Sequence, residues 1–257
     1  MQLHNAVSRA LETLEFLASS TEPKTLNEIC THLDAPKTSM NPIIYTLLEK
    51  NFIQHADSHR AYIIGPASYI VGCGYLERFD ILKYIRGMME EIVHKCSETC
   101  YFATLHGPNV FYILKVDSPE KIRMASSVGT HFPAYATSLG KTMLIGRTKE
   151  EIAALYPEGL TALTEKTITN LDDFMAELDR TARRGYAVDE EESYLYVRCR
   201  AIPVFLDGKP VAALSISTPS FRLDEEKEKL ILQLLKEYQL KLQDVIEKDR
   251  DGFFNII

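Results

Sequence analysis

The sequence predicts an α+β protein in two parts: a small helical unit with a hairpin, and a larger unit built on a mostly antiparallel sheet. Three observations support this prediction. Apolar residues recur at helical spacing at the start of the chain, an alternation of period two begins near Thr99, and turn residues separate paired apolar runs. The chain has 257 residues, of which 46% are hydrophobic. This is enough apolar surface for one large core or two ordinary ones.

The first 65 residues have the element order of a winged helix-turn-helix domain. Thr25 with Glu28 three residues later forms a capping-box pattern, which marks the start of the second helix. Two short apolar runs flanking a polar turn predict the hairpin. The expected elements are helices at 7–18, from Thr25 and up to about Lys50, and strands at 52–55 and 61–64.

The start of the third helix depends on Pro42. Proline inside a helix costs about 3 kcal/mol but is favoured at the first helical position. Asn41 and Pro42 therefore predict an N-cap and a first helical residue. On this interpretation the helix begins late, and residues 37–40 form an extended approach to it.

Gly65 and Pro66 mark a boundary between the two parts. It predicts domains at 1–65 and 80–257, joined by a linker helix at 66–79. Asp80 is expected to cap a long helix that opens the second domain. The other expected elements are strands at 101–105, 110–116, 122–128, 186–188, 198–206 and 210–217, and helices at 138–146, 149–156, 171–184 and 224–246.

Composition limits the possible function classes. No apolar run approaches the ~18–20 residues that span a bilayer, and the first residues lack the pattern of a signal peptide. A cytoplasmic protein without membrane association is expected. The five cysteines include no Cys-x-x-Cys pair, which predicts reduced structural thiols, and neither a metal nor a cofactor is expected. Cys96 and Cys100 are expected to be buried.

The sequence also lacks the motifs of the common enzyme classes. It contains no Gly-x-Ser-x-Gly, Walker A, Gly-x-Gly-x-x-Gly or His-Glu-x-x-His pattern. The acidic run at 189–192 suggests metal or general-acid chemistry, but it is interpreted as a solvated edge. We therefore expect no catalytic residues and no enzymatic activity.

Two groups of motifs carry a resemblance to a known family. The first is AVSRALETLEFL at 6–17, LNEI at 26–29 and APKTS at 35–39. The second is PAYATSLGK at 133–141, RGYAVDE at 184–190, RC at 198–199, AIPV at 201–204, AALSISTP at 212–219 and RL at 222–223. In order and spacing the chain resembles the IclR family of bacterial transcription regulators over nearly its whole length.

The resemblance implies a winged helix for operator DNA, a dimerising linker helix and a GAF-like effector-binding domain, assembled as a homodimer or a dimer of dimers. In this architecture the third helix enters the major groove. The expected DNA-binding residues are Arg9, Lys37, Thr38, Ser39, Met40, Asn41, Tyr45 and Arg60. The alternative is that Thr38 and Ser39 only cap the helix and that Arg9 only forms a surface ion pair.

The resemblance also places a small-molecule effector site in the second domain. The matching positions are Met124, Ser138, Leu139, Asp189, Cys199, Ser215 and Ser217. Two hydroxyls on alternate residues of one strand face the same side, and backbone N–H groups near Ser138 offer an anion site. These features suit a small carboxylate. The alternative is that Ser215 and Ser217 only satisfy local backbone groups in a buried sheet.

Three features depart from this picture. Ser138 and Tyr196 stand where the family pattern has glycine, so the pocket is narrower or takes a ligand with an aromatic or hydroxyl-rich part. Pro42 replaces a family arginine. Residues 1–65 carry five basic and seven acidic residues, a net charge of −2 within a total of −7. Because phosphate contacts drive DNA affinity, a sensor or assembly module with weak or lost DNA binding is the alternative function.

Overall fold

The computed structural model describes residues 4–56, 60–77, 80–124 and 131–254. The chain divides into two compact units, Met1–Arg78 and Phe79–Ile257. Each unit has its own hydrophobic core.

Before α4, the first unit contains helices α1 to α3 and a three-stranded antiparallel sheet of order β1-β3-β2. The predicted capping box is present at α2, where the Glu28 amide donates to Thr25 Oγ1 and the Thr25 amide donates to the Glu28 carboxylate. The short first strand was not predicted. The elements are α1 Asn5–Ser19, β1 Lys24–Thr25, α2 Leu26–His32, α3 Lys37–Glu49, β2 Ile53–His55 and β3 Ala61–Ile64.

The prediction that α3 starts at Asn41 and Pro42 is wrong. The helix begins at Lys37 with Pro36 as its N-cap, and Pro42 lies inside it. Core packing explains the earlier start, because Met40 lies four and seven residues before the buried Ile44 and Leu47 and shares their helical face. Pro42 lacks one N–H, so a single backbone hydrogen bond is lost in the second turn.

Helix α4 Pro66–Glu77 follows the hairpin and is tied to it at its start. The Ala67 amide donates to the Asn51 carbonyl, and Ser68 Oγ donates to the Phe52 carbonyl at 3.0 Å. Ile70 and Val71 on this helix are 68% and 63% exposed. The helix therefore begins as part of the first unit and presents apolar side chains outside that unit's core.

The second unit is built on a six-stranded sheet of order β6-β5-β4-β9-β8-β7, and all of its strand pairs are antiparallel. This confirms the predicted sheet. Residues 122–124 of the predicted strand are not in strand conformation, and residues 125–128 lie outside the described residues. The strands are β4 Thr99–His106, β5 Asn109–Val116, β6 His131–Pro133, β7 Ala187–Glu190, β8 Val197–Leu206 and β9 Lys209–Pro219.

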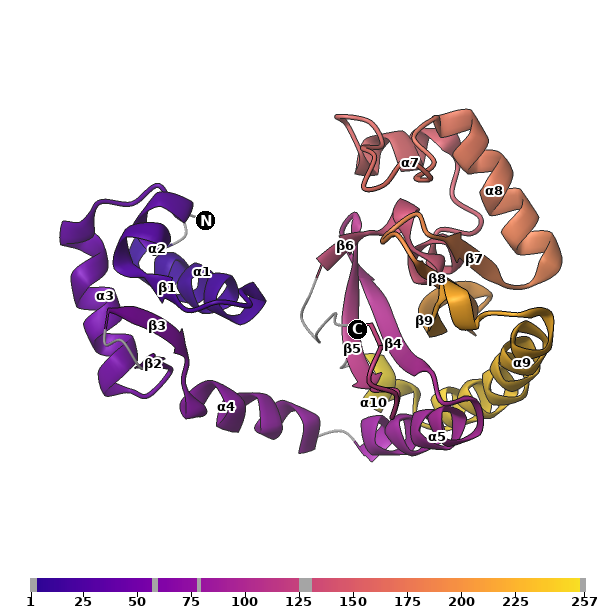
Figure 1. The fold of residues 1–257 in the computed structure, drawn as a ribbon, viewed down its shortest axis with the longest axis horizontal. Coiled ribbons are helices and arrows are strands. Elements are labelled where there is room, and N and C mark those ends of the chain that lie inside the picture. The colour runs from indigo at the N-terminus through magenta and orange to yellow at the C-terminus, as the bar shows by residue number, and fades with distance from the viewer. Residues whose placement is uncertain (1–3, 57–59, 78–79, 125–130, 255–257) are drawn as a thin grey trace. The chain divides into compact units, whose positions relative to one another are not determined.

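Helices cover both faces of this sheet (Figure 1). Helices α5 and α9 pack on one face, and α6 with α7 and α8 lies on the other. Gly185, at a φ of 79°, ends α8 at the predicted residue. The helices are α5 Asp80–Cys96, α6 Ser138–Met143, α7 Lys149–Leu155, α8 Leu171–Arg184, α9 Glu225–Lys248 and α10 Arg250–Phe254, with short 3₁₀ turns at Ala134–Ala136 and Ser220–Arg222.

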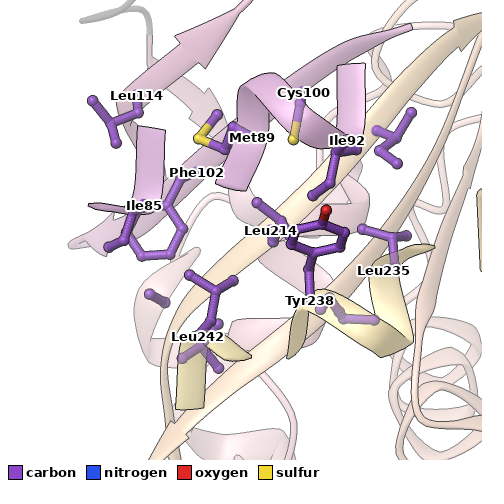
Figure 2. Close-up of a cluster of buried hydrophobic side chains, with 14 of the residues drawn as sticks. Ile85, Met89, Ile92, Cys100, Phe102, Leu114, Leu214, Leu235, Tyr238 and Leu242 are labelled. Carbon is purple, nitrogen blue, oxygen red and sulfur yellow. The ribbon is translucent and has the colours of Figure 1, made fainter. Parts of the chain in front are cut away.

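The two faces of the sheet differ in composition. Large aliphatic and aromatic side chains fill the layer under α5 and α9, where Phe102 and Leu214 of the sheet meet Met89 of α5 and Tyr238 of α9 (Figure 2). The opposite face carries small side chains at alternate positions, including Ala103, Ala201 and Ala213. Alternation along β8 and β9 thus gives one side with large apolar side chains and one side with smaller ones.

All five cysteines are free thiols. Cys96 and Cys100 are buried as expected, and burial raises the pKa of both thiols. In the part of the chain that the structure describes, no helix is long and apolar enough to cross a membrane.

Candidate functional site

The first turns of α3 present polar side chains to solvent. Lys37, Thr38, Asn41 and Tyr45 are all exposed, and so is Arg60 next to the hairpin. The helix start leaves backbone N–H groups and these side chains on one side of the domain. This is the arrangement by which a recognition helix reaches a DNA groove.

Three predicted DNA-binding residues are less available. Arg9 and Ser39 are half-buried, and Arg9 Nη1 donates to Ser39 Oγ at 3.0 Å. Ser39 Oγ in turn donates to the Pro36 carbonyl at 2.8 Å. Met40 is fully buried in the core, so its side chain is not available to DNA. These contacts fix the orientation of α3 on α1.

The predicted effector residues of the sheet lie in two rows on the side with small residues. Residues directly opposite each other in antiparallel strands point to the same face. One row runs through Asp189, Cys199, Ser217 and Thr99 across β7, β8, β9 and β4. The neighbouring row joins Ala187, Ala201, Ser215, Tyr101 and Lys115. The sheet therefore brings Asp189, Cys199, Ser215 and Ser217 together.

Cys199 and Ser217 form the centre of this surface. Cys199 Sγ and Ser217 Oγ lie 3.1 Å apart, in a hydrogen bond that either atom can donate. Both side chains are buried, and desolvation raises the pKa of Cys199 well above its usual range, so the thiol is neutral. Because one of the two hydrogens is used in this bond, the pair offers a ligand one donor, either the Ser217 hydroxyl or the weaker Cys199 thiol.

Asp189 is bound by the turn that follows it. Its carboxylate accepts from the Glu192 amide at 2.7 Å and from the Ser193 hydroxyl at 2.5 Å. The side chain is 1% exposed, and desolvation by burial raises its pKa from 3.8 to about 6. The carboxyl of Asp189 therefore changes its protonation state near pH 6.

A pH-dependent stability follows from Asp189. The raised pKa means that the folded chain binds the proton more tightly, so this group's contribution to stability is full below pH 4 and is lost as the pH rises through about 6. As the pH rises from 5 to 7, the free energy of unfolding of Asp189→Asn should increase by about 1–2 kcal/mol relative to that of the wild type. Urea unfolding at several pH values measures this, and parallel curves for the two proteins would contradict it.

Helix α6 covers this surface and carries two further predicted residues. Ser138 and Leu139 lie in its first turn, are buried, and belong to a helix that packs on β8 and β9. Thr137 caps the helix by accepting from the Gly140 amide at 3.0 Å. A Cβ at Gly140 would lie 2.1 Å from the Ala134 carbonyl oxygen. Only glycine allows α6 to approach this turn so closely.

Met124 lies at the outer end of the same surface. Together with Ser217 and Tyr196 it lines a cavity of about 190 Å³ beside the ends of β8 and β9. Its carbonyl accepts from Lys115 Nζ at 3.5 Å. Of the seven predicted effector residues, Met124 and Ser217 are the two that line this cavity.

The acidic run at 189–192 is not the solvated edge that we expected. Asp189, Glu191 and Glu192 are buried, because cations from other elements pair with the run. Lys141 of α6 is fully buried and donates to the Glu192 carboxylate at 2.5 Å and to the Val188 carbonyl at 3.0 Å. Burial raises the pKa of Glu192. The pair fastens the 189–193 turn to α6.

The sequence reasoning missed several residues of this site. Tyr101 and Tyr112 lie on the same side of the sheet, with ring centroids 5.0 Å apart, and burial raises the pKa of Tyr112 well above its usual range. The period-two pattern through Thr99 contained a signal for Tyr101. The position of Lys115 depends on strand register, and the partner of Lys141 is 51 residues away, so neither followed from local pattern.

Two models of known protein families match this chain. The model described as "Bacterial transcriptional regulator IclR C-terminal" matches residues 73–243, and "IclR helix-turn-helix domain" matches residues 6–57. The chain belongs to the IclR family. This IclR-family protein is thus a ligand-responsive DNA-binding transcription regulator, with the helix-turn-helix in the first unit and the effector domain in the second.

Known relatives match nearly the whole chain in sequence and in fold. The HTH-type transcriptional regulator KdgR of Escherichia coli is 28% identical over 249 residues, covering 95% of this chain and 92% of that protein. The structure of an IclR transcriptional regulator from Alicyclobacillus acidocaldarius is 25% identical, with a TM-score of 0.85, covering 95% of this chain and 99% of that one. An IclR homolog from Microbacterium hydrocarbonoxydans, complexed with 4-hydroxybenzoate, shares the fold at 16% identity and a TM-score of 0.78, covering 95% of this chain and 100% of that one.

Proposed function

We propose that this IclR-family regulator binds operator DNA through Lys37, Thr38, Asn41 and Tyr45 of α3, with Arg60 of the hairpin at the adjacent groove. The exposure of these side chains on an intact recognition helix is the observation that carries the proposal. Thr and Asn can bond base edges or phosphates, and Lys37 supplies charge. Arg9 and Ser39 act by orienting the helix.

An electrophoretic shift on the chain's own upstream DNA tests this proposal. We expect a sequence-specific shift at about 50 mM salt, where phosphate contacts are strongest, and a shallow salt dependence because the surface has few cations. Thr38→Ala combined with Asn41→Ala should remove the preference for the operator over unrelated DNA. Glu49→Ala, at the other end of α3, is a matched control and should leave it unchanged. Absence of any specific shift would support the alternative function, a sensor or assembly module without strong DNA binding.

We further propose that the effector is a small carboxylate bound over the surface formed by Ser215, Ser217 and Cys199, under α6. Supporting this are the small side chains of that face and the hydrogen-bonding Cys199–Ser217 pair at its centre. Ser138, Leu139 and Met124 border the surface, and Asp189 shapes its edge through the 189–193 turn. No catalytic role is proposed for these residues.

Assembly as a homodimer, or as a dimer of dimers, is part of the proposal. The exposed Ile70 and Val71 of α4 support it, since a second copy would cover this apolar side. A dimer presents two recognition helices to two half-sites. Effector binding would favour one arrangement of the dimer and so change its fit to the operator, acting in the cytoplasm as a population shift.

A further inference from the structure

Two aromatic side chains border the cavity that contains Met124 and Ser217. Tyr196 precedes β8 and Phe221 follows β9, and both line this space of about 190 Å³. Tyr196 and Phe221 are close to each other in the fold because the adjoining strand ends are paired. Val197 is paired with Pro219, and the Ser220 amide donates to the Tyr196 carbonyl at 2.8 Å. The two rings thus come from adjoining strand ends at one cavity.

These rings are not part of a core. Tyr196 is 72% exposed and Phe221 is 69% exposed, although side chains of this size normally bury most of their surface. Phe221 has Arg222 over its ring, with the guanidinium carbon 5.5 Å from the centroid. Apolar ring surface is therefore left available at the cavity.

The backbone conformation at Tyr196 is a second reason to expect a ligand beside this ring. Its φ of 66° lies in the left-handed region, which is unfavourable for bulky side chains and which glycine adopts readily. Contacts of the backbone hold it there: the Tyr196 amide donates to the Glu191 carboxylate at 3.1 Å. The ring contributes no core packing that would offset this conformation. A tyrosine at this position therefore points to a ligand.

The size and polarity of the cavity indicate what the ligand is. Drug-sized ligands occupy pockets of roughly 300–1,000 Å³, so a space of about 190 Å³ suits a single ring. Met124, Pro219 and the two aromatic rings give it apolar walls. Ser217 adds a hydroxyl, on the same face of the sheet as Cys199. A flat group with a polar substituent matches this lining.

Resting on the proposed effector site, we infer that the effector carries a single flat ring, which binds between Tyr196 and Phe221 with its polar group towards Ser217. Ring stacking favours aromatic over saturated groups of the same size. The inference concerns which carboxylate binds, and is separate from whether the protein binds DNA.

Titration of the full-length protein with benzoate, cyclohexanecarboxylate and acetate, followed by ligand-observed NMR, tests the inference. Benzoate should bind about tenfold more tightly than cyclohexanecarboxylate, which has the same charge and similar bulk without a flat ring. Tyr196→Asn should weaken benzoate by about tenfold, and Phe221→Leu, which keeps apolar bulk, should weaken it several-fold. Tyr84→Asn, which removes a ring that is 68% exposed on α5, is the control and should change nothing.

Weaker binding by Tyr196→Asn can be distinguished from a loss of folding. Asparagine tolerates the left-handed conformation better than tyrosine, so Tyr196→Asn should unfold at the same temperature or higher. Equal affinity for benzoate and cyclohexanecarboxylate, no saturable benzoate binding below about 10 mM, or unchanged benzoate binding in Tyr196→Asn would each overturn the inference. If acetate binds and Ser217→Ala abolishes that binding, the proposed effector surface stands even when the ring inference fails.

Discussion

Lys141→Met should destabilise the second unit by about 3–5 kcal/mol, because removing one partner of a buried ion pair leaves the other charge uncompensated. Lys141 is fully buried and Glu192 is 5% exposed, so solvent cannot replace the lost partner. The substitution also leaves the Val188 carbonyl without its 3.0 Å donor. Urea unfolding at pH 7 measures the loss.

Two further variants identify the cause. Lys141→Met combined with Glu192→Gln removes both charges and should recover most of the lost stability. Lys149→Met removes a solvent-exposed pair with Asp172, whose side chains are 47% and 77% exposed, and should change stability by less than about 1 kcal/mol. A double variant as unstable as Lys141→Met would show that the charge on Glu192 is not the cause.

The same pair predicts how the variant responds to pH. Burial already raises the pKa of Glu192, while Lys141 lowers it. Without the lysine, the folded-state pKa of Glu192 rises further above its unfolded value, so acid should stabilise the variant relative to the wild type. The deficit should therefore be largest at neutral pH and should shrink as the pH falls towards about 5.

Gly140→Ala should cost at least about 3 kcal/mol, at or above the upper end of ordinary overpacking. The new Cβ would lie 2.1 Å from the Ala134 carbonyl oxygen and 2.3 Å from its Cα. Both are backbone atoms, so no side-chain rotation relieves the clash. The shift of α6 would also displace Ser138 and Leu139 from the proposed effector surface, which should weaken ligand binding in any protein that still folds.

Gly87→Ala is the matched control for this substitution. Gly87 lies within α5, and nothing would lie within 4 Å of an added Cβ. Alanine is the better helix former, so this variant should gain about 0.5–1 kcal/mol. Thermal unfolding compares the two. A Gly140→Ala protein as stable as the wild type would mean that the turn before α6 has room to move.

Local patterns predicted most of the fold. The capping box at Thr25, the Gly185 stop of α8 and the alternation along β8 and β9 each depend on a few neighbouring residues, and each matches the structure. Alternation also placed Ser215 and Ser217 on one face of β9. Such features are readable because the physical cause and its effect lie within a few positions of the chain.

Long-range packing accounts for what the sequence did not reveal. Pro42 looks like the start of a helix, but burial of Met40 requires helical structure from Lys37. The acidic run at 189–192 suggests a solvated edge in the sequence, but in the fold Lys141 of α6 donates to the Glu192 carboxylate. In each case a contact with another element overrides the local preference.

The contrast between the two sides of the sheet has a consequence for how such a sensor diverges. Along β8 and β9, residues that face the proposed effector surface alternate with Ile202, Leu214 and Ile216, which pack under α5 and α9. A change of side chain at Cys199 or Ser215 therefore leaves the packing of the other layer in place. A lineage can therefore acquire a new effector through a few substitutions on this side while the packing under α5 and α9 is kept.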